Sequence, residues 1–326
     1  MTAPNTATLW GETIAAELAA AGIDAVCIAP GSRSTPLTMA LADRAEVRVF
    51  SHLDERAAAY FALGRAKRTG RPTPLVCTSG TAAANFHPAV MEADEARVPM
   101  LVLTADRPAE LHDSGANQTT DQTKLYGDSV RWFQTLPDPA ADARKLRSLR
   151  TTVSRAVATA AGTPPGPVHL NVPLRKPLEP TPVDGSVPDD FEVPDRDGPY
   201  VSVSTGAPAP PESAIRKVAA ALDDAERPLL VCGPADGPTP DGDALRALAD
   251  ATGAPLLADP LSGHRFGDLD ACGGYDAYLD EHVTAAWPDP DVVLRFGASP
   301  TSKTLRSYLA RTEPRQFLVD PAGEWR

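Results

Sequence analysis

Short apolar runs that alternate with helix-compatible segments constrain the fold of this chain more than any other feature. In the first third of the sequence, the predicted strands are Ala25–Ile28, Val47–Phe50, Pro74–Cys77 and Met100–Leu103, and the predicted helices between them include Asp54–Lys67 and Thr81–Ala93. Strands that are apolar throughout and that follow one another through helices are typical of a parallel sheet buried on both faces. The sequence therefore predicts an α/β fold.

A second α/β pattern follows a region, 181–211, that is rich in proline, aspartate, glycine and serine and lacks periodicity. Beyond it we predict helices at 212–222, 243–251 and 302–309, and strands at 228–232, 255–258, 292–296 and 316–319. A length of 326 residues suits about two domains. We expect one parallel-sheet domain at 1–180, a linker at 181–205 and a second such domain at 206–326.

Composition excludes several classes of protein. The chain is 42% hydrophobic and 23% charged, as in folded proteins with a core, and carries a net charge of −12 without a basic segment suited to nucleic acid. No apolar run approaches the ~18–20 residues that span a bilayer. The first basic residue is Arg33, so we expect no secretory signal. Cys27, Cys77, Cys232 and Cys272 lack paired spacing, which indicates reduced core residues in a cytoplasmic protein.

The predicted strand ends locate a candidate site. In open parallel sheets, ligands bind at the carboxyl ends of the strands. This rule selects four loops of the first domain, at 29–35, 51–55, 78–81 and 104–118. Arg33, Glu55 and Arg107 each lie just beyond a predicted strand, so we expect these three side chains to face a ligand.

Several common motifs are missing from the sequence. No Gly-x-Gly-x-x-Gly follows a strand, no lysine follows a glycine as in a Walker A loop, and no Gly-x-Ser-x-Gly elbow occurs. The six histidines form no His-x₃-His or Cys/His cluster. An organic cofactor is therefore favoured over a zinc ion or a serine nucleophile, and we expect no metal ligands within the chain.

Four blocks of sequence carry a resemblance to one family. They are IAPGSRSTPLT at 28–38, SHLDERAAAYFALG at 51–64, TSGTAAANFHPAVMEA at 78–93 and LTADRPAELHDSGANQTTDQ at 103–122. In order and spacing they resemble the thiamine-diphosphate-dependent 2-succinyl-5-enolpyruvyl-6-hydroxy-3-cyclohexene-1-carboxylate synthases of menaquinone biosynthesis. The wider thiamine-diphosphate group shares only the glutamate after the second strand and the Ser-Gly-x-Ala helix start.

The resemblance implies a particular domain organisation. The first domain would be a pyrimidine-binding domain, and the second a central Rossmann-like domain. A third domain of the family binds the diphosphate with Mg²⁺ or Mn²⁺ through a Gly-Asp motif followed by an asparagine. Although Gly267-Asp268 is present, no asparagine follows Asn171, so we expect that third domain and its metal site to be absent from this sequence.

By this resemblance, Glu55 is the catalytic acid. Its carboxyl would bind ring N1′ of the cofactor and favour the tautomer whose imino group removes the thiazolium proton. The resemblance also implies that Ser79, Gly80, Thr81 and Asn85 bind the cofactor, because small residues at a helix start allow a flat ring to approach. From the pattern alone, residues 51–55 could equally be a helix capping box, and the 78–81 turn an ordinary strand–helix turn.

Two dicarboxylates, 2-oxoglutarate and isochorismate, are the substrates that the resemblance implies. Bidentate guanidinium contacts suit such anions, and Arg33 and Arg107 match basic positions of the family. The substrate-binding residues would be Ser32, Arg33, Arg107, Asn117, Gln118 and Lys303, although Lys303 could also be an exposed helix start. His52, His87 and His112 remain unassigned.

The resulting hypothesis is a synthase that decarboxylates 2-oxoglutarate and adds the succinyl-semialdehyde carbanion to isochorismate. The family places its cofactor between subunits, which implies a homodimer or homotetramer. Two alternatives stay open at this point. One is another thiamine-diphosphate lyase or decarboxylase that acts on a different 2-oxo acid, and the other is a non-catalytic binding module that only associates.

Overall fold

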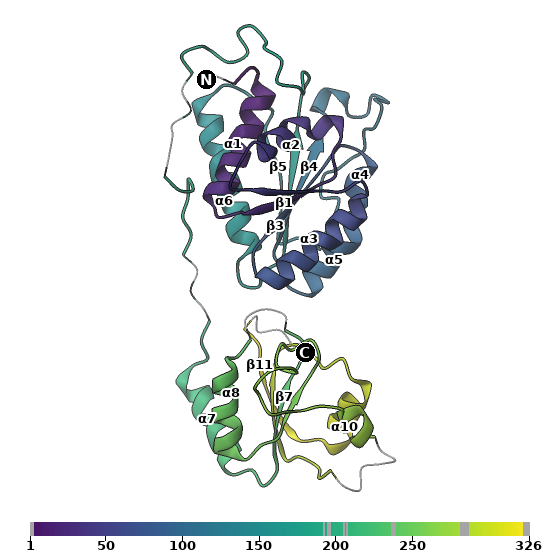
Figure 1. Ribbon diagram of the computed structural model, residues 1–326, viewed down its shortest axis with the longest axis vertical. Coiled ribbons are helices and arrows are strands. Elements are labelled where there is room, and N and C mark those ends of the chain that lie inside the picture. The colour runs from purple at the N-terminus through teal and green to yellow at the C-terminus, as the bar shows by residue number, and fades with distance from the viewer. Residues whose placement is uncertain are drawn as a thin grey trace. The chain divides into compact units, whose positions relative to one another are not determined.

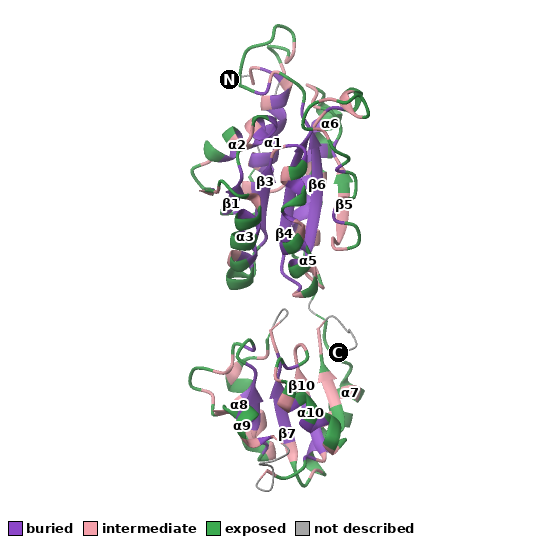
Figure 2. Cartoon of the chain, turned by 90° about the vertical axis from the view of Figure 1, so that its right-hand side faces the viewer, coloured by how far each residue is buried: buried purple, intermediate pink, exposed green. Residues whose placement is uncertain are grey.

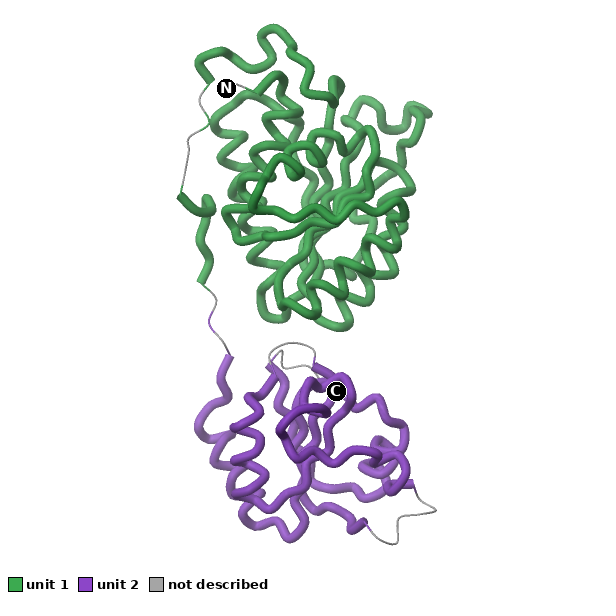
Figure 3. The backbone as a smooth tube through the Cα atoms, in the orientation of Figure 1, with its two compact units in different colours: residues 1–205 green, residues 206–326 purple. Residues whose placement is uncertain are grey.

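The computed structural model describes residues 3–191, 193, 197–204, 206, 208–235, 239–280 and 287–321. It divides into two compact units, Met1–Thr205 and Gly206–Arg326 (Figure 3). Residues 181–205, which the sequence suggested as a linker, are grouped with unit 1. Each unit is a parallel sheet with helices on both faces (Figure 1).

The sheet of unit 1 has six strands in the order β2-β1-β3-β4-β6-β5, and every neighbouring pair is parallel. The strands are β1 (Ala25–Ile28), β2 (Arg48–Ser51), β3 (Thr73–Cys77), β4 (Met100–Asp106), β5 (Trp132–Thr135) and β6 (Pro167–Pro173). β1, β3, β4 and β6 are buried at every position, as Figure 2 shows. The four predicted strands are confirmed, β2 one residue later than expected, whereas β5 and β6 were not predicted.

Helices cover both faces of this sheet. One face packs against α1 (Thr6–Ala20), α2 (Thr35–Ala42) and α6 (Ala143–Ala160), and the other against α3 (Glu55–Thr69) and α5 (His87–Glu95). The single helix expected at 81–93 was wrong, because it is divided into α4 (Thr81–Ala84) and α5. Pro88 explains the break, since proline has no N–H to continue the helix and suits its first turn. Two 3₁₀ turns, η1 (Ser32–Ser34) and η2 (Ala109–Leu111), complete the loops.

A buried carboxylate binds the segment at residues 200–201 to two helices of unit 1. Glu17 of α1 is 3% exposed, and its Oε1 accepts hydrogen bonds from Ser154 Oγ of α6 and from the Tyr200 backbone N–H, both at 2.5 Å. The Val201 N–H donates to the same Ser154 hydroxyl at 3.3 Å. Because a buried charge is stable only when it is hydrogen-bonded, these contacts hold residues 200–201 against α1 and α6.

Unit 2 has a five-stranded parallel sheet in the order β11-β10-β7-β8-β9. Its strands are β7 (Pro228–Cys232), β8 (Leu256–Ala258), β9 (Ala271–Cys272), β10 (Val292–Phe296) and β11 (Arg315–Val319). α7 (Glu212–Asp223) and α8 (Gly242–Thr252) contribute to one core, and α9 (Tyr275–Tyr278) and α10 (Lys303–Thr312) to the other. β7 and β10 have the predicted bounds.

The cysteines are unpaired, as the sequence predicts. Cys27, Cys77 and Cys232 are buried and Cys272 is partly buried, and all four are free thiols. Burial raises the pKa of Cys27 and of Cys232 to about 12, so both stay protonated and unreactive at neutral pH. In the part of the chain that the structure describes, no helix is both long and apolar enough to cross a bilayer.

Candidate functional site

The loops at the carboxyl ends of β1 and β3 are in direct contact. The Arg33 N–H donates to Thr78 Oγ1 at 3.2 Å. Gly31 permits this approach, because a Cβ there would lie 2.5 Å from Thr78 Cβ, closer than two carbon atoms can pack. The two predicted loops therefore form one edge of a site.

Arg33 is the buried cation of this edge. Its side chain is 4% exposed, and Nη1 donates to the Leu174 carbonyl, just beyond β6, at 2.6 Å. Among the described residues its Nε has no hydrogen-bond partner. Burial lowers the pKa of Arg33, and the charge of Arg107 lowers it further, while Asp106 opposes the shift. Two neighbouring guanidinium groups of this kind favour an anion between them.

Arg107 is held by its own loop. Its N–H donates to Asp106 Oδ1 and its Nη2 donates to the Asn117 carbonyl, both at 2.7 Å. This second bond closes the loop on itself and brings two predicted substrate residues together. Asn117 and Gln118 are both exposed, so their side chains remain accessible to a ligand.

The turn after β3 has a conformation that requires glycine. Gly80 has φ +89° and ψ −145°, which side chains rarely tolerate. On one side of it, Ser79 Oγ donates to the Gln118 carbonyl at 3.1 Å, and Gln118 Nε2 donates to the Ser79 carbonyl at 3.0 Å. Gln118, predicted at the substrate, is thus paired with the predicted cofactor turn. Thr81 on α4 and Asn85 just after it are exposed, and Asn85 Nδ2 donates to the Thr81 carbonyl at 3.0 Å.

Glu55 is the first residue of α3 and is partly buried. The helix start expected at 51–55 is confirmed, with Asp54 as a simple cap that accepts the Ala57 N–H at 2.7 Å rather than a capping box. The Glu55 carboxylate itself has no hydrogen bond or ion pair to any described residue. Its charge, after burial, contributes to the raised pKa of Cys77, two residues before Ser79. The carboxylate is therefore near the end of β3 and is available to a ligand.

The other predicted residues are less constrained. Ser32 is exposed in η1, and Lys303 is an exposed residue at the start of α10 in unit 2, whose helix is capped by Ser302. His112 Nε2 lies 3.1 Å from the Arg107 carbonyl oxygen and 3.8 Å from Asp106 Oδ2. Among the remaining histidines, the His52 ring packs 5.1 Å from Phe61, and the His87 ring packs edge-on against Tyr126.

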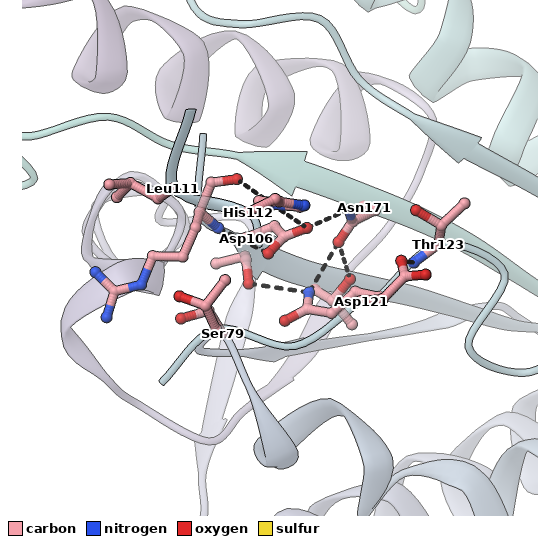
Figure 4. Close-up of polar contacts among 12 residues, drawn as sticks. Ser79, Asp106, Leu111, His112, Asp121, Thr123 and Asn171 are labelled. Carbon is pink, nitrogen blue, oxygen red and sulfur yellow. Dashed lines mark hydrogen bonds and ion pairs between the residues drawn. The ribbon is translucent and has the colours of Figure 1, made fainter. Parts of the chain in front are cut away.

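A buried polar network behind the site was not predicted (Figure 4). Asn171 Nδ2 donates to Asp106 Oδ2 at 2.7 Å, and Gln122 Nε2 donates to Asn171 Oδ1 at 2.9 Å. Thr104 Oγ1 donates to the same Asn171 oxygen and contacts His169 Nε2 at 2.7 Å. The alternation in PVHLNVP at 167–173, with polar residues two apart on one face of a strand, is the sequence signal that could have revealed it.

His169 is fully buried, and burial lowers its pKa to about 3. It is therefore neutral at physiological pH and serves the network as a hydrogen-bonding group. A cavity of about 340 Å³ is lined by residues of η2 and of the loop that follows it. The lining residues include Leu111, His112, Asp113, Thr119, Thr120 and Asp121, three of which are labelled in Figure 4.

Part of unit 1 matches a known domain family, and the chain as a whole is similar to known enzymes. Residues 10–125 match the family described as thiamine pyrophosphate enzyme, N-terminal TPP binding domain. The chain is 62% identical over 333 residues to the 2-succinyl-5-enolpyruvyl-6-hydroxy-3-cyclohexene-1-carboxylate synthase of Haloquadratum walsbyi, covering 100% of the chain and 54% of the relative. It is 60% identical over 341 residues to the enzyme of the same name from Haloarcula marismortui, covering 100% of the chain and 57% of the relative.

A more distant relative extends the likeness. The synthase of the same name from Roseiflexus castenholzii is 50% identical over 334 residues, which covers 99% of the chain and 56% of the relative. The chain therefore resembles these synthases along nearly its whole length, and the resemblance seen in the four sequence blocks is confirmed. The chain spans about half the length of the curated relatives that it matches.

Proposed function

We propose that this chain is part of an enzyme that decarboxylates 2-oxoglutarate and adds the remaining succinyl unit to isochorismate. The product would be 2-succinyl-5-enolpyruvyl-6-hydroxy-3-cyclohexene-1-carboxylate, on the way to menaquinone. The observation that carries the proposal is the similarity, at 50–62% identity over nearly the whole chain, to synthases of that name.

Two elements of unit 1 suit thiamine diphosphate. Glu55 offers a carboxyl group with no hydrogen bond to a described residue, and Gly80 gives the turn after β3 a backbone conformation that side chains rarely adopt. When bound, the cofactor supplies a thiazolium carbon that becomes nucleophilic on loss of its proton. Glu55 would hold a proton against the pyrimidine ring nitrogen, while Ser79, Thr81 and Asn85 line the same turn. Mg²⁺ would neutralise the diphosphate, and no group of three or more metal-binding side chains is present among the described residues.

The charges beside this turn suit a dicarboxylate. Arg33 is buried and its pKa is depressed by burial and by Arg107, so an anion placed between them would regain the electrostatic energy that burial costs. Asn117 and Gln118, with Ser32, would supply neutral hydrogen bonds to the substrate. Lys303 of unit 2 would add a third cation. A lyase for a monocarboxylate such as pyruvate needs fewer cations, so this arrangement favours the synthase.

An exposed apolar surface supports self-association. Leu53 is 98% exposed just before α3, Tyr60 and Phe61 are 46% and 41% exposed on α3, and Met91 is 52% exposed on α5. The two helices are in contact and cover the same face of the sheet of unit 1. Exposed apolar patches commonly mark protein interfaces, and Leu53 lies two residues before Glu55. We propose a homodimer or homotetramer that buries this face, and a cytoplasmic location consistent with the four free thiols.

The test is turnover by the complete protein. With thiamine diphosphate, Mg²⁺ and both substrates, we expect loss of isochorismate, measured by its absorbance, to match carbon dioxide release. Omission of either substrate or of the cofactor is the control. Release of carbon dioxide without consumption of isochorismate would favour a decarboxylase, and no reaction with either substrate would contradict the proposal.

A further inference from the structure

A single line of hydrogen bonds joins the two halves of the candidate site. It begins at the Gly80 N–H, which donates to Gln122 Oε1 at 2.8 Å, and Gln122 Nε2 donates to Asn171 Oδ1 at 2.9 Å. Asn171 Nδ2 then donates to Asp106 Oδ2 at 2.7 Å, and Asp106 Oδ1 accepts the Arg107 N–H at 2.7 Å. The line therefore connects the peptide of the cofactor turn to the peptide of the substrate arginine (Figure 4).

The chemistry of this line requires two amides. Gln122 and Asn171 each accept through oxygen and donate through nitrogen, so their dipoles run in one direction toward the carboxylate of Asp106. All three side chains are at most 2% exposed. Hydrogen bonds aligned in this way polarise one another, and an interrupted line leaves buried polar groups without partners. An aliphatic side chain at either amide position would make neither bond, and an ionised carboxylate could accept but not donate.

The two ends of the line are the positions that most need support. The Gly80 backbone conformation is sparsely populated and persists only where its surroundings hold it, and the Gln122 oxygen does so from the buried side. At the other end, Asp106 fixes the Arg107 backbone and raises the pKa of Arg33 against the effects of burial and Arg107. A shift of either amide would therefore move the cofactor turn and weaken the arginine pair together.

We propose that Gln122 and Asn171 are positioning residues that hold the cofactor turn and the Arg107 loop in one fixed arrangement. This inference rests on the proposed function for the identity of the ligands, but the coupling itself is a property of the chain. Its specific consequence is that a change at Asn171, whose side-chain hydrogen bonds to described residues include neither Gly80 nor Arg107, affects ligands at both ends.

The experiment compares three variants in the complete protein. Gln122→Met and Asn171→Leu keep the approximate volume and remove the polar line, whereas Gln122→Glu keeps the acceptor for Gly80 and loses the donor to Asn171. Thr13→Val is the control, because Thr13 is equally buried but bonds only to its own helix. Thermal unfolding identifies which variants are folded before binding is measured.

The first measurement is ligand binding and turnover. We expect Gln122→Met and Asn171→Leu each to raise the Kd for thiamine diphosphate and the KM for 2-oxoglutarate about tenfold. Gln122→Glu should recover cofactor affinity but not the substrate KM, a division that a purely structural residue would not produce. Wild-type affinities and KM values in folded Gln122→Met and Asn171→Leu would overturn the positioning role.

The second measurement does not depend on catalysis. Hydrogen exchange of the peptide that contains Gly80 should accelerate about tenfold in Asn171→Leu and remain unchanged in Thr13→Val. Unchanged exchange in Asn171→Leu would overturn the coupling. A wild-type protein without turnover, but with the expected exchange difference, would contradict the proposed function and leave the coupling supported.

Discussion

The two units have parallel sheets of the same kind, but the carboxyl edges of those sheets differ. In unit 1 this edge holds a buried cation, Arg33, a buried anion, Asp106, and amides that link them to neighbouring turns. Among the described residues of unit 2, the buried polar side chains are Asp259 and Ser262, both on the loop after β8. Among the described residues, this edge therefore carries a buried cation and a buried anion in unit 1, and a single buried carboxylate in unit 2.

Backbone fills the corresponding edge of unit 2. A Cβ at Gly233 would lie 1.8 Å from the Ala298 carbonyl oxygen, and one at Gly297 would lie 2.6 Å from the Pro234 oxygen. Asp259 Oδ2 accepts the Thr301 N–H and hydroxyl at 2.8 and 2.7 Å, so its charge is used within unit 2. The comparison teaches that the sheet fixes where a site can form, whereas the loop side chains decide whether one does.

The largest effect is expected for Glu55→Gln. This change keeps the shape of the side chain but removes its acid function, and acid–base contributions are typically about 10²–10⁴-fold in rate. Steady-state turnover by the complete protein should fall by at least about 10²-fold, with unchanged thermal unfolding. Glu92→Gln on the exposed surface of α5 is the matched control. A Glu55→Gln variant that retains more than about a tenth of wild-type activity would show that Glu55 is not the catalytic acid, so the site would not be at this edge of unit 1.

Arg107→Ala should weaken use of a dicarboxylate substrate by roughly 1.5–3 kcal/mol, the range for hydrogen bonds to charged groups, or about 10- to 150-fold in kcat/KM. Arg147→Ala, at an exposed position of α6, should have no effect. The measurement is kcat/KM for each substrate in turn. Equal kinetics for wild type and Arg107→Ala would mean that the charged edge of unit 1 does not bind substrate.

Asp259→Ala tests whether the buried carboxylate of unit 2 stabilises that unit alone. The substitution removes the acceptor for the Leu261 and Thr301 N–H groups and the Thr301 hydroxyl, and should destabilise unit 2 by about 2–3 kcal/mol. Hydrogen exchange in increasing urea measures each unit separately. Protection in unit 1 should stay at its wild-type level, and an equal loss in both units would contradict the local role of Asp259.

His169 gives unit 1 a pH dependence. Its folded pKa of about 3 lies below the ordinary 6.5, so the unfolded chain binds the extra proton as pH falls through 6.5. The stabilisation is complete above pH 6.5 and is lost progressively toward pH 3, by about 2 kcal/mol between pH 7 and 5. When urea unfolding is measured across this range, the free energy of unfolding of His169→Gln should depend less steeply on pH than that of the wild type. An equally steep dependence of the unfolding free energy on pH would contradict the assignment of this effect to His169. His264→Gln in unit 2 is the control.

The smallest effect is expected for Lys303→Ala. A cation at a helix N-terminus is unfavourable by about 0.3–1 kcal/mol, so the variant should stabilise unit 2 by this amount. If Lys303 also contacts substrate, kcat/KM for a dicarboxylate should fall, but by less than in Arg107→Ala. Lys217→Ala, on the exposed surface of α7, is the control. A gain in stability with unchanged kinetics would confine the site to unit 1.

The sequence predicted the central strands because burial on both faces leaves an uninterrupted apolar run, as in β1 and β7. It missed β5, whose half-exposed WFQT stands at the sheet edge, and β6, whose apolar run is interrupted by His169 and Asn171. The site loops were predicted because they follow strands and carry the family motifs. The link from Gln122 to Asn171 joins residues 49 apart in the sequence, so only the folded sheet reveals it.

The exposed apolar face of α3 and α5 has a consequence for chemical labelling. Methionine thioethers are oxidised by peroxide at a rate that follows their exposure. Met91 is 52% exposed on this face, Met39 is 41% exposed on α2 at the opposite side of the sheet, and Met100 is fully buried. Met39 therefore serves as a partly exposed reference away from this face and Met100 as the protected one, and oxidation of Met91 more slowly than Met39 would report that another surface covers α3 and α5.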